Sequence, residues 1–263
     1  MKDDDVSRMW DRNAETWAHD VRKGYDTYRD LFNNPAFFEF AGDLRGLTVL
    51  DVGCGEGYNT RLSAKRGARM TGTDISKEMI RLAWEAEEEQ PLGIRYEVAP
   101  AADVAMFEDG SFDAVVSTMA LMDCADYEGA IEEIARLLKA GGLLAFSINH
   151  PCFTNALLSH DRDEQGRPVA VRTGDYFDAG PVIDEWGFAR APEDEHENPF
   201  RVPRFPRLLS QYLNALPKNG FVIEGVHEPR PTEEACREDE RLWKWRLAPI
   251  FLYVKARRVS PPG

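Results

Sequence analysis

The sequence has few cysteines and no long apolar run, and these two absences exclude several classes of protein. The four cysteines are far apart in the chain, so no C-x-x-C pair exists and a disulfide scaffold is excluded. No segment approaches the ~18 consecutive apolar residues of a membrane span. The five histidines show no H-x-x-x-H spacing, and we therefore predict no metal site.

Basic residues are scarce relative to acidic ones. The 263-residue chain has 32 Lys and Arg against 46 Asp and Glu, which gives a net charge of −14. Such a surface repels phosphate backbones and anionic lipid heads, so neither nucleic acid nor a membrane is an expected partner. The acidic first residues lack the apolar core of a signal peptide. Together with the unclustered cysteines, this predicts a cytoplasmic protein.

Short apolar runs alternate with helical patterns between residues 48 and 148, which is typical of a parallel sheet with helices on both faces. The expected strands are Thr48–Val52, Arg69–Thr73, Ile94–Val98, Phe112–Thr118 and Leu143–Ile148, and the expected helices are Tyr58–Arg66, Lys77–Glu89 and Tyr127–Lys139. Ser76 is a suitable N-cap for the second helix. The alternation resumes with a helix over Pro206–Leu216 and strands over Phe221–Gly225 and Ile250–Arg257.

Two segments depart from this alternation. Trp10, Ala14, Trp17 and Val21 have helical spacing, and we predict that residues 1–46 form an N-terminal helical cap. Residues 151–206 are irregular but rich in aromatic side chains, which predicts an inserted substrate-binding lid with a hairpin over residues 176–188. The alternative is that these aromatic side chains form a contact between two copies of the chain in a homodimer. Residues 47–150 and 207–258 then form one Rossmann-like, doubly wound α/β domain.

A glycine-rich turn follows the first expected strand. Its glycines Gly53, Gly55 and Gly57 have G-x-G-x-G spacing, and Tyr58 stands where a dinucleotide fingerprint has its third glycine. Asp51 before the turn and Glu56 within it would repel a pyrophosphate and suit a cationic group. Asp74 ends the second strand, where an acid accepts hydrogen bonds from a ribose diol. These features predict an adenosine ligand with a cationic end and disfavour a nicotinamide oxidoreductase.

Four ordered motifs resemble those of the class I S-adenosylmethionine-dependent methyltransferases. They are Asp51-x-Gly53-x-Gly55-x-Gly57, Thr73-Asp74-Ile75-Ser76, the segment 108–113, and the segment 135–142 with Ala140 in place of the usual proline. The resemblance covers about residues 45–150 and, more weakly, residues 206–257. It implies S-adenosyl-L-methionine as cofactor and S-adenosyl-L-homocysteine as product. It also implies a mostly parallel sheet with an antiparallel last strand.

The resemblance further implies which residues contact the cofactor. Asp51 would neutralise the amino group of the methionine part, Asp74 would bind the ribose hydroxyls, and Ile75 would lie against adenine. In many relatives an acidic residue binds the adenine amino group, and here that position falls near Ala102 and Asp103. Adenine would be held either by backbone groups of Ala102 or by the side chain of Asp103. The remaining implied cofactor contacts are Gly53, Cys54, Gly55, Gly57, Asn59, Thr118 and Met119.

The acceptor side of the site is indicated by fewer residues. His150 directly follows the fifth expected strand, and a pKa near ~6.5 suits a catalytic base. Its alternative is a histidine that hydrogen-bonds the turn before Pro151. Tyr25 and Tyr28 are candidates for closing the site over the substrate. Arg201 and the neighbouring Arg204 are candidates for binding a substrate carboxylate, with solvated surface positions as the alternative.

The sequence therefore predicts an enzyme that moves a methyl group from the sulfonium of the cofactor to an oxygen, or a nitrogen, of a small molecule. In such a displacement the protein mainly orients the nucleophile and the methyl group. His150 favours oxygen as the acceptor atom. C-methylation of a small metabolite and a non-catalytic S-adenosylmethionine-binding protein are the alternatives.

Overall fold

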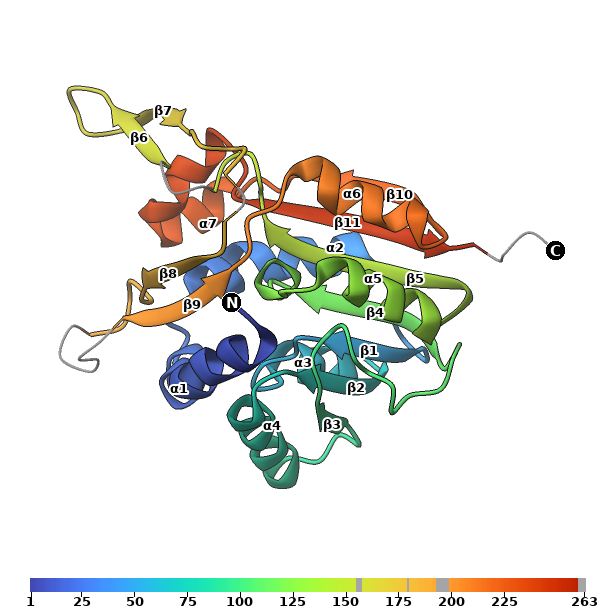
Figure 1. Ribbon diagram of the computed structural model, residues 1–263. Helices are drawn as coiled ribbons and strands as arrows, with labels where there is room; N and C mark the ends of the chain where they lie inside the picture. The colour runs from blue at the N-terminus through green and yellow to red at the C-terminus, as the bar shows by residue number, and fades with distance from the viewer. Residues whose placement is uncertain (155–157, 179, 193–198, 260–263) are drawn as a thin grey trace.

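A seven-stranded sheet with the order β10-β11-β5-β4-β1-β2-β3 forms the centre of the computed structural model, which describes residues 1–154, 158–178, 180–192 and 199–259 (Figure 1). Its strands are β1 (Thr48–Val52), β2 (Arg69–Asp74), β3 (Arg95–Val98), β4 (Phe112–Thr118), β5 (Leu138–Asn149), β10 (Phe221–His227) and β11 (Phe251–Arg258). Strand β11 is antiparallel to both of its neighbours, and the other pairings are parallel. The predicted Rossmann-like fold class is confirmed.

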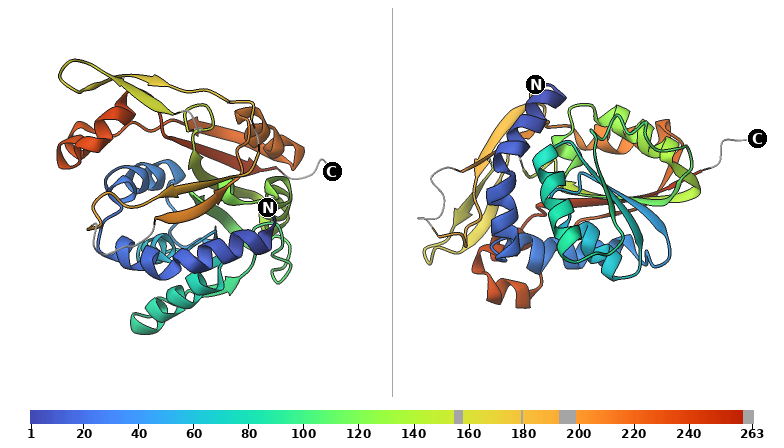
Figure 2. Two further views of the ribbon diagram at one scale, coloured as in Figure 1. Left: turned by 60° about the vertical axis from the view of Figure 1, so that its left-hand side comes forward. Right: turned by 90° about the horizontal axis from the view of Figure 1, so that it is seen from below.

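Helices cover both faces of the sheet (Figure 2). The helices are α2 (Asn34–Ala41), α3 (Tyr58–Lys65), α4 (Lys77–Glu89), α5 (Tyr127–Leu137) and α6 (Leu209–Lys218). Helices α5 and α6 pack against one face, where Ile131 and Leu216 join Leu50 of β1 in the main core. On the other face Ile80 of α4 packs with Val49 of β1. Because both faces of the central strands are covered, those strands are mostly apolar in the sequence, with polar residues such as Asp51 and Ser117 toward their carboxyl ends.

All seven strands expected for the sheet are present, and β4 and α4 have the predicted bounds. The Ser76 hydroxyl caps α4 by accepting a hydrogen bond from the backbone of Met79 at 3.1 Å. Helix α3 ends one residue before its predicted end and α6 spans Leu209–Lys218 instead of Pro206–Leu216. Helix α5 ends at Leu137, two residues before its predicted end, and the chain enters β5 at Leu138. Residue Leu138 pairs with Phe112 of β4, so strand pairing replaces the last turn of the expected helix.

Two hairpins form within residues 151–206. Strand β6 (Ser159–Arg162) pairs with β7 (Pro168–Arg172), and β8 (Val182–Trp186) pairs with β9 (Phe200–Arg204). The predicted hairpin over residues 176–188 is therefore wrong, because the partner of β8 lies downstream of it. Trp186 faces Phe200 across the pair, and both pack with Trp17 and Phe188 at ring-centroid distances of 5.1–5.6 Å. This tertiary cluster outweighs the local turn signal. Residues 155–157, 179 and 193–198 of the predicted lid lie outside the described part.

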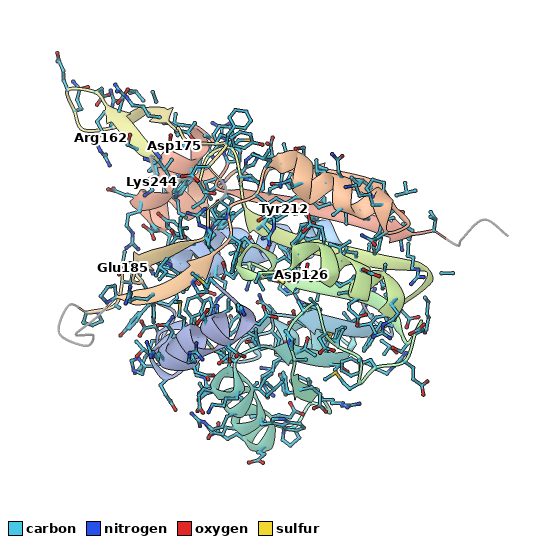
Figure 3. All side chains as sticks on the ribbon, in the orientation of Figure 1. Asp126, Arg162, Asp175, Glu185, Tyr212 and Lys244 are labelled. Atoms are coloured by element: carbon cyan, nitrogen blue, oxygen red, sulfur yellow. The ribbon has the colours of Figure 1, made fainter. Side chains whose placement is uncertain are left out.

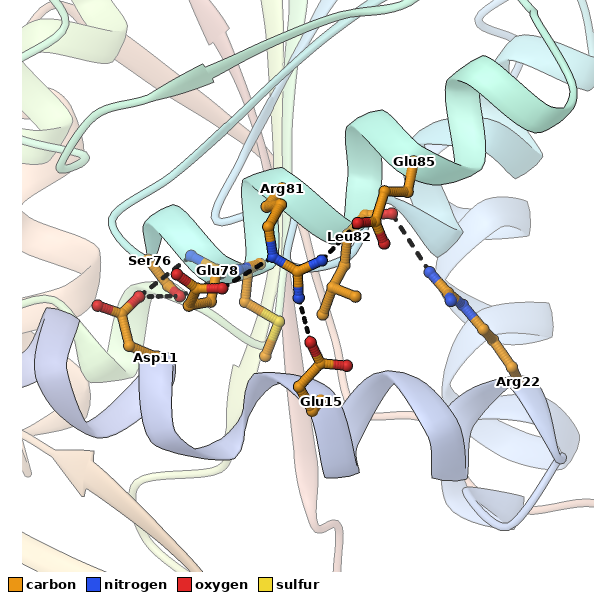
Figure 4. A network of polar contacts seen from close by, with 9 residues as sticks. Asp11, Glu15, Arg22, Ser76, Glu78, Arg81, Leu82 and Glu85 are labelled. Atoms are coloured by element: carbon orange, nitrogen blue, oxygen red, sulfur yellow. Dashed lines mark hydrogen bonds and ion pairs between the residues drawn. The ribbon is translucent and has the colours of Figure 1, made fainter.

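Helix α1 (Asp3–Arg22) runs along α4 and beside the β8–β9 hairpin, at the edge where β1 and β4 end (Figures 1 and 2). The predicted apolar face exists, and its Ala14 packs against Met79 of α4. Polar contacts flank this packing (Figure 4): Asp11 accepts a hydrogen bond from Ser76 at 2.7 Å, and Arg81 forms ion pairs with three glutamates, one of them on α1. Helix α1 is thereby fixed across the carboxyl edge of the sheet.

Short helical segments complete the same edge. They are the π-helical turn η1 (Arg29–Asn33), the 3-10 turns η2 (Leu121–Asp123) and η3 (Glu240–Arg246), and helix α7 (Glu233–Glu238). The Thr27 hydroxyl donates to Asp239 at 2.5 Å, and the Tyr253 hydroxyl donates to the backbone oxygen of Asn33 at 3.0 Å, so these segments are tied together and to β11. None of the helices in the described residues is long and apolar enough to cross a membrane.

Candidate functional site

A cavity of about 610 Å³ lies at the carboxyl edge of β1, β2 and β4. This is where an open α/β sheet binds its ligands, and the volume is in the usual range for a small-molecule site. One wall comes from the glycine-rich turn, the end of β2 and the segment after β4. The opposite wall comes from α1, the loop before η1, the β8–β9 hairpin and η3. The cavity thus joins the predicted cofactor motifs to the two segments that depart from the α/β pattern.

The backbone of the glycine-rich turn is fixed by its own hydrogen bonds. The amides of Gly53 and Cys54 both donate to the carbonyl of Thr73, at 2.8 and 2.9 Å. Gly53 and Gly55 have φ angles of +73° and +56°, which favour glycine. A Cβ on Gly53 would lie 2.2 Å from the Cβ of Ala120, whereas a Cβ on Gly55 would meet no atom within 4 Å. Gly55 therefore presents bare backbone to the cavity that it lines.

Two carboxylates face this turn inside the cavity. Asp51 is 2 % exposed and accepts a hydrogen bond from Thr60 at 2.6 Å, and burial raises its pKa to about 7. Asp74 accepts from the amides of Gly55 and Ser76, each at 2.9 Å, and burial raises its pKa to about 6. Neither forms an ion pair with a cation among the described residues. Such acids fit a ligand that brings a positive charge and hydroxyl donors of its own.

The other cofactor positions predicted from the sequence divide into two groups. Residues Cys54, Asn59, Ile75, Thr118 and Met119 line the cavity together with Gly53 and Gly55. Residues Gly57, Ala102 and Asp103 are not part of the lining, and the loop after β3 contributes residues 99–101 instead. A Cβ on Gly57 would lie 2.6 Å from the hydroxyl of Tyr96, so this glycine serves the packing beneath the turn.

His150 does not line the cavity. Its ring is 2 % exposed and packs against Phe153. The Nε2 atom lies 2.7 Å from Glu228, and Nδ1 accepts from the amide of Cys152 at 3.2 Å, so both ring nitrogens are occupied. Burial lowers the pKa of His150. This arrangement matches the turn-binding alternative and leaves the ring no free nitrogen for a substrate.

The remaining predicted substrate contacts are Tyr25, Tyr28 and Arg201. Both tyrosines line the cavity. Arg201 is exposed and pairs with Glu185, which projects from β8 in Figure 3, at 3.0 Å. Arg204 lines the cavity in its place and binds Asp184 through two contacts of 2.6 and 3.1 Å. Positions three apart in a strand point to opposite faces, so only one of the two arginines can face inward.

Several cavity residues were not predicted from the sequence. Asp123 in η2 is 8 % exposed, and burial raises its pKa well above the usual range. Lys244, labelled on η3 in Figure 3, is half-buried, and burial lowers its pKa. The guanidinium of Arg29 lies 3.9 Å from the centre of the Tyr58 ring. A usable signal existed for Asp123 alone, because it follows a strand whose carboxyl end was already expected at the ligand edge.

Aromatic side chains make up much of the wall opposite the glycine-rich turn. The rings of Trp17, Trp186 and Phe188 pack edge-on or tilted against one another and line the cavity. Other aromatic lining residues are Trp10, Tyr25, Tyr28, Tyr58 and Phe251. Such walls favour flat, apolar ligands. No group of three or more His, Cys, Asp or Glu side chains in the described residues could hold a metal ion.

Comparison with known proteins finds similarity to methyltransferases over part of the chain. The methyltransferase domain model matches residues 50–146. A ubiquinone biosynthesis O-methyltransferase of Xanthomonas oryzae pv. oryzae is 37% identical over 117 residues, which are 43% of this chain and 49% of that protein. The chain thus spans about half the length of the first curated relatives that it matches. A protein of the same name from Alkalilimnicola ehrlichii is 29% identical over 69% of this chain and 72% of its own.

The similarity to solved structures extends further along the chain. The crystal structure of an S-adenosylmethionine-dependent methyltransferase from Mesorhizobium loti superimposes with a TM-score of 0.70 at 29% identity. The superposition covers 85% of this chain and 96% of that one. The likeness therefore includes more than the segment that the family model matches.

Proposed function

We propose that the chain is a class I S-adenosylmethionine-dependent methyltransferase and that it transfers a methyl group to a hydroxyl oxygen of a small aromatic acceptor. The observation that carries the proposal is one cavity in which the cofactor motifs on one wall face aromatic side chains on the opposite wall. Residues 1–46 and 151–206 supply the aromatic side of that cavity, and residues 47–150 supply most of the other.

We assign the cofactor to the side with the glycine-rich turn. The bare backbone of Gly55 lets a ligand approach closely, and Asp74 offers its remaining acceptor capacity to ribose hydroxyls. Asp51 offers a negative charge to the amino group of the methionine part. The lining by Ile75 and residues 99–101 provides an apolar slot for adenine. When bound, the cofactor supplies a sulfonium methyl group of high intrinsic reactivity, and the protein's task is to orient the acceptor.

Oxygen is proposed as the acceptor atom for two reasons. The relatives from Xanthomonas oryzae pv. oryzae and Alkalilimnicola ehrlichii carry the name O-methyltransferase. The aromatic wall around Trp17, Trp186 and Phe188 suits a planar ring that carries the hydroxyl group. Tyr25 and Tyr28 cover the acceptor from the N-terminal side. We do not assign the base to His150, because both of its ring nitrogens are occupied.

Calorimetric titration with S-adenosylmethionine tests the cofactor assignment. We expect micromolar binding to the wild type, and affinity weaker by about 1–3 kcal/mol for Asp74→Ala, which removes a buried hydrogen-bond acceptor. Glu132→Gln on the exposed surface of α5 is the matched control and should bind like the wild type. A wild type that binds neither S-adenosylmethionine nor S-adenosylhomocysteine would contradict the proposal.

A screen of small acceptors then tests the chemistry. Phenols, catechols and aromatic amines are incubated with the protein and S-adenosylmethionine, and both S-adenosylhomocysteine and the methylated product are measured by mass spectrometry. We expect turnover with a phenolic hydroxyl. Methylation confined to amines or to ring carbons would replace oxygen as the acceptor atom, and cofactor binding without any turnover would favour a non-catalytic binding protein.

A further inference from the structure

Asp123 is the buried acid of the cavity that no cofactor motif accounts for. It ends η2, five residues after the last residue of β4, and it lines the cavity on the same rim as Thr118 and Met119. Only 8 % of the residue is exposed, and its carboxylate forms no ion pair with a cation of the described residues. A buried carboxylate without a counter-charge is costly, so a polar group of a bound acceptor is a fitting partner for it.

The charged groups around Asp123 shift its pKa without forming an ion pair with it. Arg204 of β9 is the cation that most lowers the pKa of Asp123, and its two contacts of 2.6 and 3.1 Å go to Asp184 of β8. The guanidinium of Arg207, after β9, donates to the carbonyls of Phe205, Cys124 and Ala125. The negative charges of Asp184 and Asp74 raise the pKa of Asp123. The pKa of Tyr212 of α6 is raised by burial and also by the carboxylate of Asp123. Burial and these acids raise the pKa of Asp123, while the two arginines partly offset the rise.

We propose that Asp123 is the catalytic base of the methyl transfer and accepts the proton of the acceptor's hydroxyl group. The inference rests on the proposed function and assigns the proton-accepting role that His150 does not fill. Burial raises the pKa of Asp123, so its carboxylate is a stronger base toward a hydroxyl proton than an exposed one. The aromatic wall would hold the acceptor ring while the hydroxyl points at Asp123, on the rim that carries the cofactor residues.

The chemical step balances without another reactant. The hydroxyl oxygen forms a bond to the methyl carbon while the carbon–sulfur bond breaks and leaves its electron pair on sulfur, which becomes a thioether. The O–H bond breaks with its electron pair kept by oxygen, and the proton goes to a carboxylate oxygen of Asp123. Water takes the proton from Asp123 after the product leaves. Positive charge is lost from the cofactor and a neutral methyl ether is formed.

A stability measurement tests the ionisation of Asp123 without any acceptor. Because the folded-state pKa is raised, the protonated form stabilises the fold fully below pH about 4, and this stability is lost as the pH rises toward the folded-state pKa. Asp123→Asn is permanently neutral, so its Tm should equal that of the wild type near pH 4 and exceed it by about 3 °C or more at pH 8. Glu132→Gln removes one exposed charge and should show no such divergence.

A chromophoric phenol tests the contact with the acceptor. 4-Nitrophenol ionises near neutral pH and its anion has its own absorbance, so its pKa can be read while it is bound to the protein with S-adenosylhomocysteine. A carboxylate beside the phenol opposes a second negative charge, and we expect the pKa of the bound phenol to be at least about one unit higher in the wild type than in Asp123→Asn. A merely structural Asp123 would leave this pKa unchanged.

Turnover completes the test with the acceptor found in the screen. Asp123→Asn should lower kcat about 10²–10⁴-fold and abolish the acidic limb of the pH–rate profile, while binding of S-adenosylmethionine stays unchanged. Equal phenol pKa values and equal pH profiles in both proteins would overturn the role of Asp123 and leave the proposed function standing. Absence of nitrophenol binding in both proteins, together with failure of every hydroxyl acceptor, would overturn the proposed function and this inference with it.

Discussion

Two neighbouring glycines of the same turn should respond very differently to alanine. Gly53 and Gly55 both have positive φ angles, so each alanine carries a backbone cost of about 1–2 kcal/mol. At Gly53 the new Cβ would also lie 2.2 Å from the Cβ of Ala120, a contact that neither backbone can avoid without shifting. Overpacking of this kind adds about 1–3 kcal/mol. Gly53→Ala should therefore cost about 2–5 kcal/mol, and Gly55→Ala only the backbone part.

Gly55→Ala, the variant that loses less stability, should still lose affinity for the cofactor. At Gly55 the Cβ meets no protein atom within 4 Å and would project into the cavity, where we place the methionine part of the cofactor. Gly55→Ala should stay folded and bind S-adenosylmethionine at least about tenfold more weakly, which corresponds to about 1.4 kcal/mol.

Urea unfolding gives the stability of each variant and calorimetry gives its affinity at 25 °C. Ala120→Gly is the informative partner, because it removes the atom that a Cβ on Gly53 would strike. The Gly53→Ala, Ala120→Gly double variant should recover the overpacking part of the loss but not the backbone part. Equal destabilisation by Gly53→Ala and Gly55→Ala, or no recovery in the double variant, would refute the assigned packing of the turn.

Two further predictions concern buried charges. Burial raises the pKa of Asp51 to about 7, so its negative charge is gained as the pH rises through that value; affinity for S-adenosylmethionine should rise between pH 5.5 and 8, by at most about tenfold per unit for this group, whereas Asp51→Asn should lose the rise above pH 7 and keep only the part near pH 6 that belongs to Asp74. Arg61 binds Glu87 at 2.6 Å in a buried ion pair outside the cavity; Arg61→Leu should cost about 3–5 kcal/mol in urea unfolding while cofactor affinity is retained, and a loss below about 1 kcal/mol would contradict this account.

The cavity wall that contains the glycine-rich turn could be predicted from the sequence because its determinants are local. The turn that contains Gly53 and Gly55, the acid at the end of β2 and the cap Ser76 all lie within short segments whose spacing and residue types are visible in the chain. Parallel strands deliver their carboxyl ends to one edge, so the motifs converge without knowledge of distant contacts. Strand positions were accordingly predicted to within a few residues.

The acceptor side could not be predicted in the same way because long-range packing decides it. The partner of β8 is set by the contact of Trp186 with Phe200 and with Trp17 of α1, and no local signal marks that pairing. Whether Arg201 or Arg204 faces inward depends on the register of that hairpin, since a shift of one residue exchanges the two faces. His150 was misleading for a related reason, because its partner Glu228 lies 78 residues away.

Helix α1 links the two walls of the cavity. The family model ends at residue 146, just before the chain leaves β5 and enters the segments that build the aromatic wall. Those segments are held by α1, whose own position depends on packing against α4 and on the hydrogen bond from Asn13 to the carbonyl of Arg201. Helix α1 therefore contacts both halves of the site. We therefore expect a substitution that shifts α1 to change the aromatic wall and the rim near Asp74 together, and so to change affinity for the proposed acceptor and for the proposed cofactor at the same time.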